Sequence, residues 1–260
     1  MSVLKLQDVE SGRTYVLKSF QERRDGHSRL SNELRWLMRG AKHLPVPRVI
    51  CWSDPGQLMI TEHIAGLSVL EAASREDPER LGTLLGKWLA YFHSMGRVTC
   101  TRVTILCSLD LVLRRAVARG LLRTGVSEMY DSLNAEVPLV GAPWRRATYK
   151  SLLKSDCQLA NFLMVNHQII GIDFEEAGIG DDVGIDLGQL GASYVACTKR
   201  ERWKPFLDGL QRGWADHLGL SLPETWTFWL GWYWLYLQTD NADKSREFHS
   251  LFFPSSTTVG

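Results

Sequence analysis

Cysteine is scarce and scattered along this chain of 260 residues. The sequence contains no C-x-x-C pair, and its cysteines are odd in number: Cys51, Cys100, Cys107, Cys157 and Cys197. This pattern indicates neither a zinc site nor a disulfide framework, and it favours a protein of the reducing cytoplasm. The first residues, MSVLKLQDVESGR, also lack the apolar core of a signal peptide.

A large excess of charge of either sign is also absent. The formal net charge is +1, which argues against a nucleic-acid binder that works by bulk electrostatics. The apolar core of residues 225–238 is too short for a membrane span, which needs about 20 residues. We therefore expect neither a nucleic-acid partner nor a membrane partner. The hydrophobic fraction of 45% and the charged fraction of 23% are ordinary for a globular chain of one or two domains.

Residues 152–190 concentrate the polar side chains that suggest chemistry. Leu163–Val165 and Ile169–Ile172 are two apolar runs joined by a two-residue turn, which predicts a β-hairpin. Asn161 precedes the first run and Asp173 follows the second, so the hairpin should bring these two residues side by side. Two oxygen ligands at one end of a hairpin suit a site for Mg²⁺ and phosphate.

Phosphoryl transfer in kinases uses an Asp that accepts the substrate hydroxyl proton, an Asn that holds Mg²⁺ and a later Asp that bridges Mg²⁺ to the phosphates. Asp156-x-x-x-x-Asn161 has the required spacing, and Asp173-Phe174-Glu175 stands where D-F-G stands in protein kinases. Taken alone, a D-x-x-x-x-N fragment is more typical of surface Asp and Asn residues in turns. The order of loop, strand, turn, strand and Asp is far more specific.

With these motifs the chain resembles the kinase-like phosphotransferases of the aminoglycoside phosphotransferase and choline kinase group. Those enzymes typically show H-G-D-x-x-x-x-N, then I-D-F/W-E, then G-D-x-x-x-D-L-A. This chain shows Lys154-Ser155-Asp156 through Asn161, then Ile172-Asp173-Phe174-Glu175, then Gly180-Asp181 and Asp186-Leu187-Gly188.

The resemblance implies an α+β, two-lobed protein kinase-like fold. A short N-terminal β-sheet lobe for nucleotide binding would span residues 1–64. A larger, mostly helical lobe for catalysis and substrate binding would span residues 65–253, followed by a disordered tail at residues 254–260. The resemblance also implies that Asp156 is the catalytic base and that Asn161 and Asp173 are the metal ligands.

The resemblance places the nucleotide-binding residues in the first lobe. Lys18 ends a run of alternating apolar residues and would hold the α- and β-phosphates of ATP, although a lysine at a strand end is ordinarily solvated. Glu33 lies on a predicted amphipathic helix and would form an ion pair with Lys18. Glu62 and Ile64, in the segment E-H-I-A-G, would bind adenine through their backbone groups.

Two features depart from the family pattern. No glycine-rich loop lies upstream of Lys18 in this sequence, and only one strand can precede it, so we expect the first strand and its loop to be missing. Lys154 replaces the histidine of the catalytic loop. Because an ammonium group is costly to bury without a partner, we expect Lys154 to pair with a carboxylate, such as Asp173 or Glu175, or to face a phosphate.

Helices should dominate the second lobe. Asp77 and Pro78 are typical of a helix start, and apolar residues follow at helical spacing as far as Gly96. His93, on the last turn of this helix, is expected to be packed or capping. Basic residues between positions 144 and 150 are expected to be solvated. Further helices are predicted over residues 109–122, 126–133, 203–217 and 225–238.

Three functions remain open. The first is a small-molecule kinase that uses ATP and Mg²⁺ and transfers the γ-phosphate to a hydroxyl of an aminoglycoside-, choline- or sugar-like acceptor. The second is a protein kinase, but residues 174–185 leave no room for a long activation segment and no A-P-E follows. The third is a pseudokinase that binds without turnover, which the missing glycine-rich loop and Lys154 favour.

Overall fold

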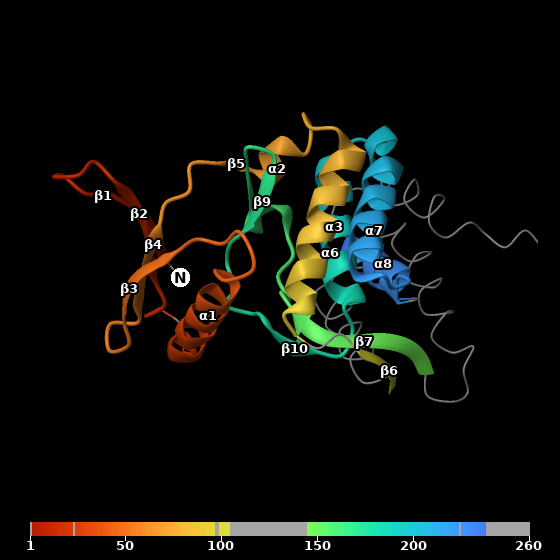
Figure 1. The fold of residues 1–260 in the computed structure, drawn as a ribbon, viewed down its shortest axis with the longest axis horizontal. Coiled ribbons are helices and arrows are strands. Elements are labelled where there is room, and N and C mark those ends of the chain that lie inside the picture. The colour runs from red at the N-terminus through yellow and green to blue at the C-terminus, as the bar shows by residue number, and fades with distance from the viewer. Residues whose placement is uncertain (1, 23, 97–98, 105–144, 224, 238–260) are drawn as a thin grey trace, which may run out of the picture.

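The computed structural model describes residues 2–22, 24–96, 99–104, 145–223 and 225–237. A small lobe built on a sheet and a larger, mainly helical lobe are visible in Figure 1. The predicted α+β, two-lobed architecture is therefore confirmed. The helices predicted over residues 109–122 and 126–133 and the tail at 254–260 lie outside the described residues.

The small lobe is an antiparallel sheet with one helix packed against it. Its strands are β1 (Ser2–Gln7), β2 (Thr14–Ser19), β3 (Val49–Ser53) and β4 (Leu58–Glu62), in the spatial order β1-β2-β4-β3. The helix α1 (Gly26–Gly40) buries Leu30, Leu34 and Leu37, which recur at the spacing of one helical face. Met59 of β4 is fully buried in the same core. The strand that carries Lys18 and the helix that carries Glu33 are thus both present.

Among the described strands, β1 pairs only with β2 and forms an edge of this sheet. The loop between the two strands contains a single glycine, Gly12, whose positive φ of 70° suits the tight turn. Among the described residues, the first strand and glycine-rich loop of the kinase pattern have no counterpart.

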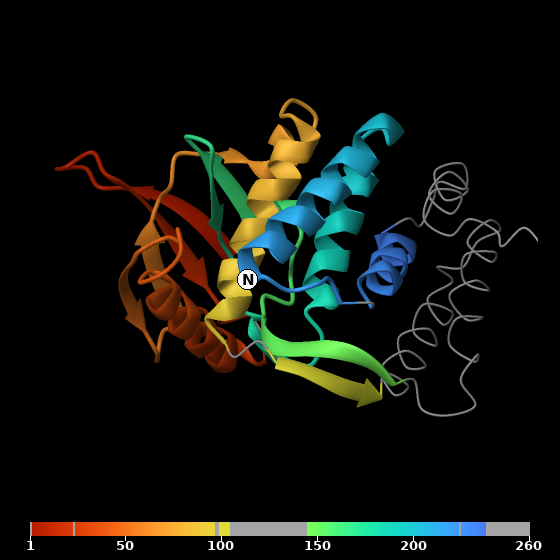
Figure 2. The ribbon, with the colours of Figure 1, turned by 45° about the vertical axis from the view of Figure 1, so that its right-hand side comes forward.

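The large lobe consists mainly of helices that pack closely against one another. The helices are α2 (Val69–Ala72), α3 (Pro78–Ser94), α6 (Gly184–Cys197), α7 (Trp203–Leu218) and α8 (Trp226–Leu237), with a short 3₁₀ turn, η2 (Arg200–Arg202), before α7. Figures 1 and 2 show α3 and α7 side by side. They can approach closely because Gly82 of α3 has no side chain. A Cβ at this position would lie only 2.1 Å from the carbonyl oxygen of Phe206.

The helices predicted at residues 203–217 and 225–238 correspond to α7 and α8 within one or two residues. The predicted start of α3 is also present, because the Asp77 side chain accepts a hydrogen bond from the Arg80 backbone. Within the described ranges, none of the helices has both the length and the apolar character that crossing a membrane requires.

Two small sheets in the large lobe carry the loops that contain Asp156 and Asp173. One has the order β5-β8-β9 and consists of β5 (Leu67–Ser68), β8 (Phe162–Val165) and β9 (Gln168–Gly171), with the 3₁₀ turn η1 (Leu159–Asn161) before β8. The other has the order β10-β7-β6 and consists of β6 (Thr99–Thr104), β7 (Arg145–Leu153) and β10 (Gly178–Gly180). The predicted hairpin is β8–β9, and its turn residues Asn166 and His167 have positive φ values of 47° and 64°.

Candidate active site

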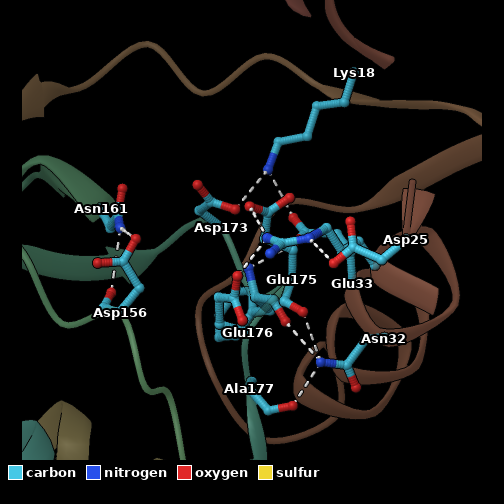
Figure 3. Close-up of polar contacts among 12 residues, drawn as sticks. Lys18, Asp25, Asn32, Glu33, Asp156, Asn161, Asp173, Glu175, Glu176 and Ala177 are labelled. Atoms are coloured by element: carbon cyan, nitrogen blue, oxygen red, sulfur yellow. Dashed lines mark hydrogen bonds and ion pairs between the residues drawn. The ribbon is translucent and has the colours of Figure 1, made fainter. Parts of the chain in front are cut away.

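Three polar residues meet where the β8–β9 hairpin ends. The Ile172 backbone N–H donates to the Asn161 carbonyl at 3.0 Å, which fixes the two ends of the hairpin beside each other. The Asn161 amide then donates to the Asp156 carboxylate at 2.8 Å. Asp173 follows Ile172 directly, and Figure 3 shows its side chain beside those of Asn161 and Asp156. The convergence expected from the hairpin is therefore present.

The carboxylate of Asp186, on α6, anchors the loop that carries Asp156. The Asp186 carboxylate is fully buried and accepts hydrogen bonds from the backbone N–H groups of Lys154 and Ser155, at 2.6 and 2.9 Å. Ser155 has a positive φ of 66°, a conformation that a side-chain-bearing residue adopts at a cost. His93 packs against the same carboxylate, with its Nε2 atom 3.1 Å from Asp186. Asp186 was noted from the sequence in the segment Asp186-Leu187-Gly188, but that segment did not reveal this anchoring role.

Lys18 and Glu33 form the expected ion pair, with 2.8 Å between the Lys18 ammonium and the Glu33 carboxylate. Lys18 Nζ also lies 3.5 Å from the Asp173 carboxylate (Figure 3). Burial alone would lower the pKa of the Lys18 ammonium, but the negative charges of Glu33 and Asp173 outweigh burial and raise this pKa above its ordinary value. Lys18 therefore stays cationic at neutral pH.

One face of α1 holds the segment that follows Asp173. Arg29, Asn32 and Trp36 lie three to four residues apart, so they project from the same side of the helix. The Asn32 amide donates to the carbonyls of Phe174, Glu175 and Ala177, at 3.4, 2.9 and 2.6 Å. Sequence reasoning missed these contacts. Their only signal was a polar stripe beside Glu33 on a helix that otherwise buries leucines.

Further contacts join α1 to the segment that follows Asp173. The Trp36 indole donates to the Ala177 carbonyl at 2.9 Å. Arg29 donates to the Glu175 carboxylate at 2.8 Å and forms an ion pair with Glu176. Its other partner is Asp25, one turn earlier in the chain. The segment from Asp173 to Ala177 is thus tied to α1 by side chains that reach both its backbone and its carboxylates.

The structure corrects the expectation for Lys154. Its side chain is fully buried and forms no ion pair with a carboxylate of a described residue. It also does not line the cavity between the two lobes. Its ammonium instead donates to the carbonyl oxygens of Asp156 and Asp173, at 2.9 and 2.7 Å. Nζ also lies 5.4 and 5.3 Å from the ring centres of Phe162 and Phe174, within the range of cation–π attraction. Carbonyl dipoles and aromatic faces take the place of the expected anion.

A cavity of about 340 Å³ lies between the two lobes. Its volume falls in the range of small-molecule sites. Apolar side chains line part of it, including Val16, Leu163 and Ile172. The predicted site residues that line it are Lys18, Glu33, Glu62, Ile64, Asn161 and Asp173. Asp156 is absent from this lining and is connected to it through its hydrogen bond with Asn161.

The segment after β4 offers backbone groups to this cavity. The N–H group of Glu62 donates to the Arg48 carbonyl at 2.9 Å, so only its carbonyl remains for a nucleobase. The backbone of Ile64 makes no hydrogen bond to another described residue. A carbonyl and an N–H group two residues apart, beside apolar walls, match the donor and acceptor edge of an adenine ring.

The donor set near Asp173 fits a hard divalent cation. The Oδ1 atom of Asp173 is buried and accepts no hydrogen bond from a described residue, although the Lys18 ammonium lies 3.5 Å from it. Within the described part of the chain, no three side chains of His, Cys, Asp or Glu cluster as a metal site. Mg²⁺ commonly takes one or two protein oxygens and completes its shell with phosphate oxygens and water. Asp173 and the amide oxygen of Asn161 would supply the protein oxygens.

The chain matches the phosphotransferase enzyme family, APH, over residues 2–232. Three solved structures share its fold. The first is a choline/ethanolamine kinase family protein from Mesorhizobium loti, with 19% identity, coverage of 97% of this chain and 86% of that chain, and a TM-score of 0.55. The second is a thermostable mutant of the aminoglycoside phosphotransferase APH(4)-Ia, with 15% identity, coverage of 99% and 96%, and a TM-score of 0.58.

The third is the amicoumacin kinase hAmiN in complex with AMP-PNP, Ca²⁺ and its ligand Ami, with 17% identity, coverage of 96% and 83%, and a TM-score of 0.53. At these identities the likeness shows the fold. No curated protein matches the chain at a significant level. The family match spans most of the chain, and it agrees with the motifs around Asp156 and Asp173. The chain therefore belongs to the phosphotransferase enzyme family and is a kinase-like phosphotransferase that acts on hydroxyl groups of small molecules.

Proposed function

We propose that the phosphoryl donor is ATP, bound with Mg²⁺, and that the γ-phosphate passes to a hydroxyl of an aminoglycoside-, choline- or sugar-like small molecule. The observation that carries this proposal is the convergence of Asn161, Asp173 and the Lys18–Glu33 ion pair at one interlobe cavity, with Asp156 hydrogen-bonded to Asn161 beside it. Phosphoryl transfer depends mainly on positioning and charge neutralisation. This arrangement supplies both.

Asp156 is the proposed general base. As the acceptor oxygen bonds to the γ-phosphorus, the Asp156 carboxylate accepts the hydroxyl proton, and the bond from the γ-phosphorus to the bridging oxygen of ADP breaks. The hydrogen bond from Asn161 holds one oxygen of this carboxylate, which leaves the other free to face the acceptor. A base must first be within reach of its proton, and this hydrogen bond fixes its orientation.

Asn161 and Asp173 are the proposed metal ligands, and Lys18 is the proposed phosphate clamp. Bound Mg²⁺ would neutralise charge that develops on the phosphates. Glu33 keeps the Lys18 ammonium beside Asp173, because the same lysine contacts both carboxylates. The fixed positive charge of Lys18 would meet the α- and β-phosphates where they leave the apolar part of the cavity.

Adenine is the proposed occupant of the apolar part. The Glu62 carbonyl would accept from the adenine amino group, and the Ile64 N–H would donate to a ring nitrogen. Both groups lie where β4 leaves the small lobe, so we place the lobe boundary between residues 64 and 65. The acceptors named for the three similar structures are an aminoglycoside, amicoumacin, and choline or ethanolamine, which supports a small polar molecule as acceptor here.

A catalytically impaired member of the family, a pseudokinase, is the second candidate, and the β1–β2 loop with its single glycine, Gly12, favours it. Calorimetric titration with ATP, with and without Mg²⁺, should show binding that strengthens when Mg²⁺ is present. Incubation with γ-labelled ATP and a panel of small-molecule alcohols should then label at least one acceptor. Mg²⁺-dependent ATP binding without any transfer or ATP hydrolysis would instead assign the chain to the pseudokinases.

A further inference from the structure

The ammonium group of Lys154 connects the two loops of the active site. It donates to the carbonyl of Asp156, the proposed base, and to the carbonyl of Asp173, the proposed metal ligand. Asp156 and Asp173 lie on different loops, and each carbonyl belongs to a residue whose side chain is proposed to act in the reaction. A single buried side chain, which does not line the cavity, therefore contacts both loops.

The Asp173 carbonyl belongs to a peptide group that is held at both ends. On one side it accepts from Lys154 at 2.7 Å. On the other side, the N–H of Phe174 in the same peptide group donates to the Glu33 carboxylate. Two charged side chains of opposite sign, one from each lobe, thus fix the orientation of this peptide plane.

Asp173 needs such support because its backbone is in the left-handed region, with φ at 61°. Residues other than glycine adopt this conformation at a cost, and surrounding contacts must maintain it. The direction of the Asp173 side chain depends on this backbone conformation. Loss of the hydrogen bond from Lys154 or of the hydrogen bond to Glu33 would let the Asp173 carboxylate turn away from Asn161.

The surroundings of Lys154 suit a buried ammonium group that forms no ion pair with a described residue. Its two carbonyl acceptors carry partial negative charge, and Nζ lies 5.4 and 5.3 Å from the centres of the Phe162 and Phe174 rings. Both rings are fully or almost fully buried. Since carbonyls and rings do not neutralise the charge, the ammonium keeps its attraction for both loops.

We propose that Lys154 is a positioning residue that fixes the Asp173 carboxylate relative to Asp156 by holding the two backbone carbonyls together. This role rests on the proposed function of Asp156 and Asp173. Lys154 does not line the nucleotide cavity, so it acts through the two loops and leaves the binding of the nucleoside to other residues. Loss of the Lys154 ammonium should therefore raise the Mg²⁺ concentration that ATP binding requires and lower kcat, while adenosine binding stays unchanged.

The test uses the full chain with Lys154→Met, which keeps the length and removes the charge, and with Lys154→Gln, which keeps one short donor. Lys154→Arg keeps the charge and the donors. Lys87→Met is the matched control, because Lys87 is exposed on α3. Each variant is compared with the parent in thermal unfolding, adenosine binding, the Mg²⁺ concentration that supports ATP binding, and kcat.

We expect Lys154→Met to stay folded and to bind adenosine like the parent. It should need about 10-fold more Mg²⁺ or more for ATP binding, the usual scale when a group behind a metal ligand is lost. Its kcat should fall about 100-fold, because displacement by about 1 Å has effects of that size. Lys154→Arg should recover most of the Mg²⁺ dependence, and Lys87→Met should match the parent throughout.

A parent-like Mg²⁺ requirement in a folded neutral variant would overturn the role of Lys154. Equal losses of adenosine and Mg²⁺-ATP binding, or failure of both neutral variants to fold, would assign Lys154 to the stability of the fold and would also overturn it. A parent that shows no Mg²⁺-dependent ATP binding would instead refute the proposed function, so the two failures are distinguishable.

Discussion

Replacement of Lys18 with methionine removes one member of a buried ion pair and leaves the other without its counterion. The Glu33 side chain is only 1% exposed, and Lys18 lies 2.8 Å from it. Breaking a buried pair by removing one partner typically costs about 3–5 kcal/mol. Lys18 is 12% exposed and borders a cavity that water can enter. We therefore expect a loss near the lower limit, about 3 kcal/mol.

Thermal unfolding measures this loss directly. For a protein of this size, about 1 kcal/mol shifts the unfolding midpoint by about 2–4 °C, so Lys18→Met should lower it by about 6–12 °C. Glu33→Gln keeps an acceptor for the Phe174 N–H and completes a double-mutant cycle. The coupling between the two substitutions should be about 2–3 kcal/mol. Lys42→Met, which removes an exposed lysine after α1, should have little effect.

Ligand binding separates the phosphate clamp from the structural ion pair. A hydrogen bond to a charged group contributes about 1.5–3 kcal/mol, so Lys18→Met should weaken ATP binding by about 10- to 100-fold. Adenosine lacks phosphates, and its affinity should remain close to that of the parent. Calorimetry with both ligands makes the comparison. Equal losses for ATP and adenosine would refute the clamp and point to a packing defect.

Two further predictions concern the segment after β9. Asp173→Asn keeps a residue type that tolerates the left-handed backbone at φ 61°, and it should remove the Mg²⁺-dependent part of ATP binding, by about 10-fold or more, while the protein stays folded. A folded Asp173→Asn protein that binds Mg²⁺-ATP like the parent would count against the metal assignment. Asn32→Asp should destabilise the protein more than Asn32→Ala in thermal unfolding, because a carboxylate would face three carbonyl oxygens. The reverse order would show that these contacts contribute little.

Local patterns were sufficient to predict the parts of the site that depend on local structure. The β8–β9 hairpin followed from two short apolar runs around a turn, and it placed Asn161 beside the residue that precedes Asp173. The Lys18–Glu33 pair, by contrast, was expected from the resemblance to the family, which a predicted strand and a predicted helix supported. In both cases the structural element determines where the side chain points.

Contacts that depend on tertiary placement could not be predicted in this way. The Asn32 amide reaches carbonyls more than 140 residues away, and no pattern within α1 indicates which backbone it will meet. The β10–β7 pairing was missed because each strand is polar or glycine-rich and finds its partner only in the folded chain. Lys154 was expected to need an anion, yet a buried ammonium can also be satisfied by carbonyl dipoles and aromatic faces.

The central claim is that Asp156 accepts the proton of the acceptor hydroxyl at a site assembled by Asn161 and Asp173. The most direct measurement is the rate of γ-phosphate release from Mg²⁺-ATP, to an accepted alcohol or to water, by the parent and by Asp156→Asn. We predict a fall in kcat of about 100-fold or more, with ATP affinity nearly unchanged, because Asp156 does not line the nucleotide cavity. Parent-level turnover in a folded Asp156→Asn variant would contradict the account.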